Sequence, residues 1–156
     1  MIRKLLLALA GLAVVTGAVF AASHATAPHK GAIKARQSVM QLRSHYLGQL
    51  GAMAKAEVPY DAEAAANAAA NLALVNTLDQ SMMWPRGSDN ASAENTRALP
   101  VIWTDGGIGA KANTFNAAVD AMKAAAGTDL ASLQAAIGPL GKACGACHED
   151  YRQSNR

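Results

Sequence analysis

Apolar side chains recur three or four positions apart along most of this chain, the spacing that places them on one face of an α-helix. The clearest stripe is the last one, and its members are Leu130, Leu133, Ile137, Leu140, Cys144, Cys147 and Tyr151. It predicts a helix over residues 130–152, whose start Thr128 or Asp129 can cap with a side-chain oxygen. Gly138-Pro139 falls inside this stretch and is expected to interrupt the helix and bend it.

Three earlier segments show the same periodicity. Residues 108–126 form one predicted helix, which Gly127 would end. Residues 64–83 form another, between two proline-containing breaks, and residues 32–55 form the first. The inward positions expected in the two earlier helices are Ile33, Met40, Leu47, Leu50, Ala54, Leu72, Val75, Leu78 and Met82.

The composition agrees with this pattern, because the chain is rich in Ala and Leu and only 4% of its residues are aromatic. No segment shows the alternation of apolar and polar residues that is typical of a strand. Four helices with mostly short connections predict an all-α fold, an antiparallel up-down-up-down four-helix bundle. The one long connection, residues 86–100, is polar and is expected to cover an end of the bundle.

The first residues have the layout of a secretory signal peptide. Arg3 and Lys4 carry positive charge, residues 5–22 are apolar and uncharged, and small residues follow. We therefore expect residues 1–25 to be a leader that is cleaved between residues 21 and 27. Residues 28–156 would then form the exported four-helix domain, located in the periplasm. A retained leader would instead tether the domain, because the apolar run approaches the length of a membrane-spanning helix.

Loss of the leader changes the charge of the chain. The full sequence has 14 Lys and Arg against 11 Asp and Glu, a formal net charge of +3. Arg3 and Lys4 leave with the leader, so the mature chain has 12 against 11, or +1, and no basic block. These features exclude a typical nucleic-acid-binding surface, and no membrane association is expected once the leader is removed.

The two cysteines lie in the sequence Cys144-Gly145-Ala146-Cys147-His148. A disulfide between them would close a loop too small to restrain the chain. Cys-x-x-Cys-His is the attachment signature of c-type haem. Positions three apart share one face of a helix, so both thiols can bind one edge of a single haem c. His148 can then ligate the haem iron as an axial ligand.

Three other interpretations of this motif are weaker. A thioredoxin-like redox pair belongs to a strand–helix context, whereas this motif ends an all-helical chain. A zinc site needs further ligands, and the remaining histidines are His24, His29 and His45. The last alternative is a pair of buried structural cysteines that matches the signature by chance.

A second axial iron ligand would have to come from an earlier part of the chain, because only eight residues follow His148. In an antiparallel bundle the start of the first helix lies beside the end of the last, which places Met40 and His148 at similar heights. Met53 would lie ~20 Å further along the first helix. Met82 and Met83 remain as alternatives. Without a haem each methionine would be interpreted as a core side chain; with one, Met40 is the best candidate.

At this point the sequence resembles a known family. The run from Cys144 to Arg152 resembles the end of the class II c-type cytochromes, the cytochrome c-prime family. Three more stretches agree, and together they span nearly the whole mature chain: Arg36-Gln37-Ser38-Val39-Met40, Met83-Trp84-Pro85 and Pro100-Val101-Ile102-Trp103-Thr104-Asp105. The resemblance implies a four-helix bundle with the haem near one end.

The resemblance also implies roles for three residues. The family position four residues after the first-helix arginine faces the distal side of the haem. In five-coordinate members it holds a bulky residue that does not ligate, and in low-spin members it holds an iron-bound methionine. Met40 therefore implies the low-spin branch. Arg36 would lie near a haem propionate, or be a solvated helix residue. Arg152 would hydrogen-bond near the proximal side of the haem or lie on the surface.

Two functions follow from these features. In the first, the protein is a periplasmic electron carrier with His148 and Met40 as iron ligands, and it exchanges electrons with redox partner proteins. In the alternative, Met40 does not bind, and the five-coordinate iron binds nitric oxide or carbon monoxide. An enzyme is not expected, because we find no paired carboxylates, Ser-His-Asp arrangement or Gly-rich phosphate loop.

The oligomeric state is left open between a monomer and a weak homodimer. Members of the resembled family are often homodimers through the first two helices. Such a dimer requires apolar residues on the outer faces of those helices. Residues 62–70 are so rich in alanine that the sequence does not separate inner from outer faces.

Overall fold

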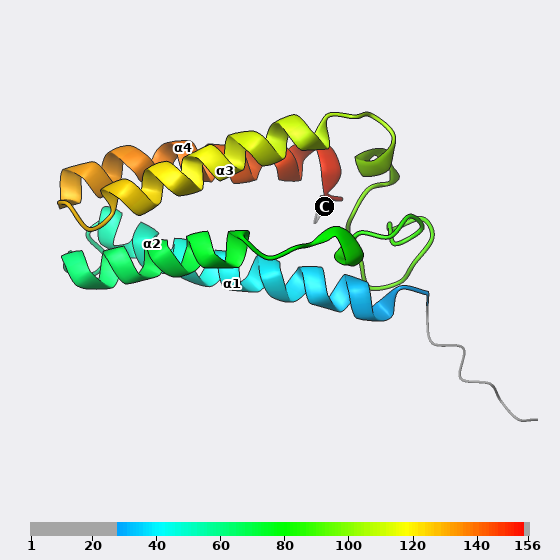
Figure 1. The fold of residues 1–156 in the computed structure, drawn as a ribbon, viewed down its shortest axis with the longest axis horizontal. Helices are drawn as coiled ribbons and strands as arrows, with labels where there is room; N and C mark the ends of the chain where they lie inside the picture. Colours follow the sequence, from blue (N-terminus) through cyan, green and yellow to red (C-terminus); the bar gives the residue numbers. More distant parts are fainter. Residues whose placement is uncertain (1–27, 155–156) are drawn as a thin grey trace, which may run out of the picture.

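The computed structural model describes residues 28–154 as four α-helices that run along the long axis of the molecule (Figure 1). These are α1 (Lys30–Ala54), α2 (Ala62–Asn76), α3 (Ile108–Ala125) and α4 (Leu130–Tyr151), with the 3-10 helices η1 (Ser81–Met83) and η2 (Pro100–Trp103) between α2 and α3. Within these residues there is no β-strand, and the predicted all-α four-helix bundle is confirmed. The predicted leader, its cleavage site and residues 155–156 lie outside the described residues.

The helices form two antiparallel pairs, α1 beside α2 and α3 beside α4 (Figure 1). The start of α1, the end of α2, the start of α3 and the end of α4 all lie at the same end of the bundle. Residues 77–107 cover this end, which we call the loop end. None of the helices that the structure describes is long and apolar enough to cross a membrane.

The core lies between the two pairs. It contains large fully buried side chains from all four helices: Leu50, Leu72, Val119, Met122, Leu133 and Leu140. Alanines such as Ala65 and Ala69 are also fully buried, and their small size lets α2 approach its neighbours closely. Gly127 follows α3, which it was expected to end, and close packing against α2 explains why a glycine stands there. A Cβ atom at Gly127 would lie 2.8 Å from the Cβ of Ala66 in α2.

The last helix, α4, begins at the residue that the sequence predicts. Asp129 caps the helix as one of the two expected residues, since its Oδ1 accepts a hydrogen bond of 2.7 Å from the backbone N–H of Ser132. The helix then continues through Pro139, where the sequence predicts a kink. Gly138 and Pro139 lie on the exposed face. The carbonyl of Ala135, which a proline cannot bond, is therefore open to water instead of being left unpaired in the core.

The second helix is shorter than predicted. It ends at Asn76, and the chain forms η1 only after a break. The Thr77 hydroxyl donates a 2.7 Å hydrogen bond to the Leu74 carbonyl, and the Asp79 carboxylate accepts one of 2.9 Å from the Ser81 N–H. Such local bonds compete with helical ones. Leu78 and Met82 are consequently exposed, by 48% and 85%, and the prediction that they face inward is wrong.

Candidate functional site

Cys144, Cys147 and His148 lie in the last two turns of α4, at the loop end, and all three are half-buried. Both thiols are free. The 3-residue spacing of the cysteines along a continuous helix places them on the same face, as predicted. The site is therefore assembled on a rigid helix and not on a loop.

Short backbone pairings hold this end of α4. Leu99 donates from its N–H to the Tyr151 carbonyl at 2.9 Å, and Gln153 donates to the Arg97 carbonyl at 2.8 Å. The Tyr151 hydroxyl donates a 2.7 Å hydrogen bond to the Asp105 carboxylate. A Cβ atom at Gly107 would lie 2.6 Å from the same hydroxyl, so only glycine fits there without movement. These contacts fix α4 against residues 97–107.

The bond between Tyr151 and Asp105 predicts a pH-dependent stability. The bond from Tyr151 lowers the pKa of Asp105, and the carboxylate raises the pKa of Tyr151 to about 12. A depressed carboxyl pKa stabilises the fold above the unfolded-state value and loses this effect as the pH falls through the folded-state pKa. A raised tyrosine pKa stabilises below its unfolded value and loses the effect as the pH rises. The melting temperatures of the wild-type protein and Tyr151→Phe should therefore differ most between about pH 5 and pH 9.

Tyr60→Phe is the matched control for this series, because the Tyr60 hydroxyl donates 2.9 Å to the Ala126 carbonyl, which does not titrate. Its destabilisation should stay constant between neutral pH and acid. A Tyr151→Phe difference that does not shrink in acid would show that Asp105 is not the group responsible.

The surroundings of the His148 imidazole favour its neutral form, which is the form that can ligate iron. Burial lowers its pKa, and the positive charges of Arg152 and Arg97 lower it further. Iron ligation requires the unprotonated ring nitrogen. Burial raises the pKa values of the Cys144 and Cys147 thiols, while the charge of Arg43 opposes this at both.

Met40 lies on α1 and is half-buried, with its Sδ atom 3.9 Å from Nη1 of Arg43. Arg43, three residues after Met40 on α1, contacts side chains of two other helices. Its Nη2 donates a 2.8 Å hydrogen bond to Oδ1 of Asn76 in α2, and its guanidinium stacks 4.9 Å over the ring of Phe115 in α3. The sequence analysis did not single out Arg43. The available signal was a charged residue, three positions after Met40, within an otherwise apolar stripe.

Arg36 is 3% exposed, so the interpretation as a solvated helix residue is wrong. Its guanidinium donates to Oγ of Ser88 at 2.6 Å, to the Ser88 carbonyl, to Oγ1 of Thr96 at 2.6 Å and to the Met83 carbonyl at 3.3 Å. It also stacks 4.5 Å over the ring of Trp84. Arg36 thus binds α1 to the long connection, and its predicted role beside a haem propionate stays a prediction.

Arg152 is exposed at the end of α4. It lies beside His148 at a cavity of about 420 Å³, whose other lining residues are Arg97, Gly145, Glu149, Gln153 and Ser154. Arg152 and His148 thus line the same cavity, and a hydrogen bond from Arg152 near the proximal side of a haem stays a prediction.

Of the remaining candidate ligands, Met83 is half-buried in η1, where its carbonyl accepts a hydrogen bond from Arg36. His45 is exposed, with its Nε2 3.3 Å from the Gln49 side chain, and Met82 is almost fully exposed. Across residues 28–154 no three His, Cys, Asp or Glu side chains are grouped as a metal site would require. A zinc centre is therefore not supported by the described part of the chain.

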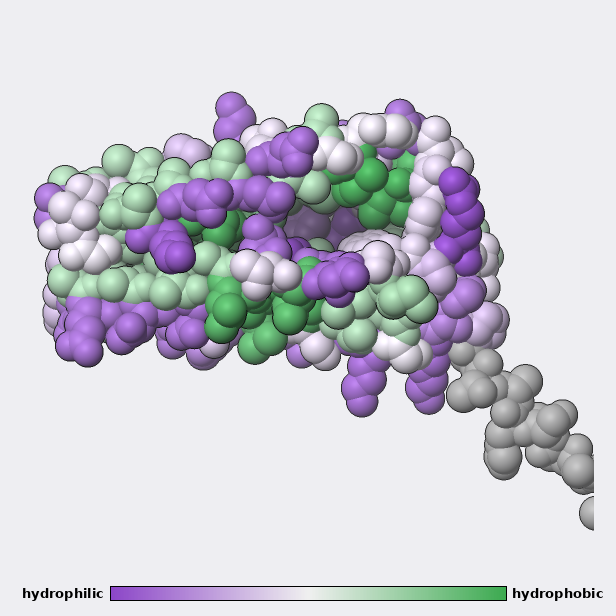
Figure 2. All heavy atoms as spheres, in the orientation of Figure 1, coloured by the Kyte–Doolittle hydropathy of each residue, from purple (hydrophilic) through white to green (hydrophobic). Residues whose placement is uncertain are grey.

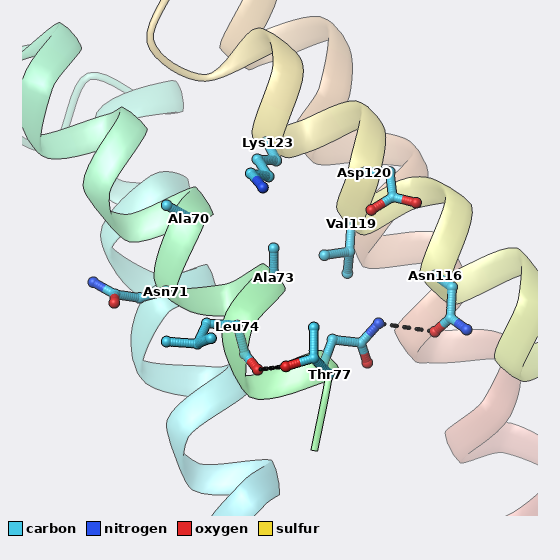
Figure 3. A pocket seen from close by; sticks show the side chains of 10 residues that line it. Ala70, Asn71, Ala73, Leu74, Thr77, Asn116, Val119, Asp120 and Lys123 are labelled. Carbon is cyan, nitrogen blue, oxygen red and sulfur yellow. Dashed lines mark hydrogen bonds between the residues drawn. The ribbon is translucent and has the colours of Figure 1, made fainter. Parts of the chain in front are cut away.

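A separate groove of about 540 Å³ lies between α2 and α3 (Figure 3). Alanines and amide side chains line it, and Nδ2 of Asn76 donates a 2.9 Å hydrogen bond to Oδ1 of Asn116 across its end. The cysteine pair does not line this groove, which we assign no ligand.

The residues at the loop end fit a haem. Figure 2 shows that the surface is hollowed there, between the two helix pairs, with strongly hydrophobic side chains on part of its wall. On α1, the Nε atom of Arg43 is buried and has no hydrogen-bond partner among the described residues. Two free thiols on one helical face and a neutral histidine complete the donor set that a covalent haem requires.

Comparison with known proteins agrees with this site. The family model described as Cytochrome C' matches residues 31–152. Cytochrome c-554 of Cereibacter sphaeroides is 48% identical over 124 residues, which cover 79% of this chain and 81% of that protein.

Solved structures share the fold. The cytochrome c' of Rhodobacter sphaeroides has a TM-score of 0.80 at 36% identity, covering 81% of this chain and 98% of that one. A variant of cytochrome c prime from Alcaligenes xylosoxidans with bound nitric oxide has a TM-score of 0.71 at 29% identity, covering 81% and 97%. Another variant of that protein was solved with carbon monoxide bound.

These matches confirm the predicted cofactor, one covalently attached haem c, for which the chain offers its two cysteines, Cys144 and Cys147. The chain therefore belongs to the cytochrome c′ family.

Proposed function

We propose that this protein binds a small gas, nitric oxide or carbon monoxide, at a haem whose iron has one protein ligand. Cys144 and Cys147 would hold the haem c through thioethers, and His148 would ligate the iron on one face. When bound, the haem supplies an iron centre with an open coordination position on the other face. This function was the alternative in the sequence analysis, and the low-spin branch implied by Met40 is not supported by the family match.

The observation that carries the proposal is the likeness to solved cytochromes c′ that hold these gases. Two variants of cytochrome c prime from Alcaligenes xylosoxidans, one with bound nitric oxide and one with bound carbon monoxide, share the fold. Each has a TM-score of 0.71, and the match covers 97% of each chain.

The protein's own groups would orient and shield the site. The Tyr151–Asp105 bond and the pairing of residues 97–99 with 151–153 hold the end of α4, so His148 keeps one position. The side chains of Met40 and Phe115 lie on the α1 and α3 walls and keep water away from the interior. A neutral imidazole in a desolvated position is suited to bind ferrous or ferric iron.

A second candidate is electron transfer through a low-spin iron held by His148 and Met40. One observation favours it: the Met40 sulfur is 3.9 Å from Arg43, whose charge acts on both cysteines, so Met40 lies at the level of the motif. Thioether ligation would raise the reduction potential and leave no open position.

The absorption spectrum of the reduced protein, before and after addition of carbon monoxide, separates the two candidates. Gas binding predicts broad high-spin bands that shift with carbon monoxide. Sharp split visible bands that carbon monoxide does not move would contradict it and favour the carrier. Met40→Ala is the matched variant, because it should leave the spectrum of a five-coordinate protein nearly unchanged but convert a six-coordinate one to a carbon-monoxide-binding form.

We further propose a periplasmic location and a homodimer. The leader-like residues 1–25 support export. Leu42 on α1, Leu74 on α2 and Leu78 after α2 are exposed by 43%, 66% and 48%. Apolar residues on the outer faces of the first two helices are the feature that a dimer through these helices requires. Sedimentation equilibrium should give the mass of a dimer for the mature protein, and a monomer mass at all concentrations would refute the dimer.

A further inference from the structure

Arg43 is half-buried, and its guanidinium lies between side chains of neighbouring helices. It contacts one residue in each of three helices, at 3.9 Å from Met40 Sδ, 2.8 Å from Asn76 Oδ1 and 4.9 Å from the Phe115 ring centre. Its charge also acts on the two cysteines of α4. A single guanidinium thus contacts side chains of α1, α2 and α3 and acts electrostatically on the cysteines of α4.

This charge has no counter-ion. Within residues 28–154 no carboxylate forms an ion pair with Arg43, and its partners Asn76, Met40 and Phe115 are all neutral. Asn76 is fixed with its oxygen toward Arg43, because its amide nitrogen donates to Asn116 in the groove of Figure 3. The Nε atom of Arg43 is buried without any partner in the described part of the chain.

An arginine stays charged even when burial lowers its pKa, as it does here. A half-buried charge with a buried, unpartnered nitrogen and no counter-ion carries a desolvation cost. An apolar residue at this position of the stripe would avoid that cost. The charge is therefore expected to act on a group that the folded protein holds nearby.

That group is the iron centre of the proposed haem, and the inference rests on the proposed function. The ring carbons that form thioethers and the propionates lie on different sides of the macrocycle. A cation whose charge acts on Cys144 and Cys147 is thus expected on the thioether side of the ring, away from the propionates. It acts instead through the ring on the iron, whose charge falls by one when it takes up one electron.

We propose that Arg43 sets the reduction potential of the haem by favouring the ferrous state. A fixed cation in a medium of low dielectric constant destabilises the neighbouring state with the larger positive charge. Arg43 thereby raises the midpoint potential. At a given ambient potential it enlarges the fraction of ferrous protein, the form to which carbon monoxide binds. The electron comes from a one-electron redox protein in the cell or from a mediator in a titration, and no bond breaks.

Spectroelectrochemical titration of the mature haem protein tests this role. Arg43→Gln and Arg43→Met remove the charge, and the methionine variant keeps an apolar side chain of similar length should the glutamine variant fail to fold. Both should lower the midpoint potential, whereas Arg43→Lys should keep it close to the wild-type value. Lys142→Gln is the matched control, because Lys142 is an exposed cation on α4 two residues before Cys144. It should shift the potential little, since water and salt screen it.

The titration is repeated in the Met40→Ala background, so that a change in iron ligation by Met40 cannot produce the shift. A fall in both backgrounds that exceeds the fall in Lys142→Gln supports the inference. A fall no larger than in the control, or an equal fall in Arg43→Lys, overturns it. A normal haem spectrum with no shift refutes the role of Arg43 alone, and the absence of a haem spectrum in the parent protein refutes the proposed function as well.

Discussion

Replacing both Cys144 and Cys147 with alanine is expected to abolish covalent retention of haem. The two thiols lie on one face of α4, half-buried at the hollowed loop end, and the chain has no other cysteine. Haem that is not covalently attached leaves the chain on denaturation and extraction with acidified organic solvent. The double variant should therefore lose all of the haem absorbance of the denatured chain, whereas each single variant keeps one attachment point.

Gly145→Ala provides the matched control for this loss. Gly145 lies between the cysteines, and a Cβ atom there would meet nothing within 4 Å. This variant should retain haem fully, because alanine also favours the helix. Haem that remains on the denatured double variant would refute attachment through these thiols.

Replacing Arg36 with alanine should produce the largest loss of stability outside the cysteine motif. Arg36 donates hydrogen bonds to Ser88, Thr96 and Met83 and stacks on Trp84. At about 1 kcal/mol for each of the four hydrogen bonds, two of which go to Ser88, and about 0.5–1 kcal/mol for the stacking, the expected cost is about 5 kcal/mol. The free energy of unfolding from a urea titration measures this cost.

Gln37→Ala is the control for Arg36, because Gln37 is an exposed neighbour with a single 2.7 Å bond to the Asn95 carbonyl. It should cost less than about 1 kcal/mol. Equal costs at the two positions would show that the buried guanidinium does not hold the long connection. Faster proteolysis within residues 86–97 of Arg36→Ala would locate the loosened segment.

The helices α1, α3 and α4 could be predicted closely because each carries a long apolar stripe, and much of the buried core consists of those positions. The end of α2 could not be predicted. Leu78 and Met82 continue the spacing of the stripe, but the Thr77 and Asp79 side chains bond to the local backbone and end the helix first. Hydrophobic periodicity alone does not show whether these local bonds or a further helical turn is the more stable.

Some residues of the candidate site could be predicted from the sequence, and others could not. The cysteines and His148 were predictable, because attachment to one haem edge demands their spacing within a single helix. The roles of Arg36 and Arg43 were not, since their partners Ser88, Thr96 and Asn76 lie 33 to 60 positions away. An arginine in an apolar stripe signals an unusual environment, but only the folded arrangement shows which groups surround it.

The most direct test of the account is the mass of one tryptic peptide from the purified protein, produced in cells that mature c-type cytochromes. Cleavage after Lys142 and after Arg152 releases residues 143–152, which contain both cysteines and His148. The account predicts that this peptide carries one haem and has no free thiol. A peptide of unmodified mass, with two free thiols or a disulfide between Cys144 and Cys147, would contradict the haem site and every function proposed from it.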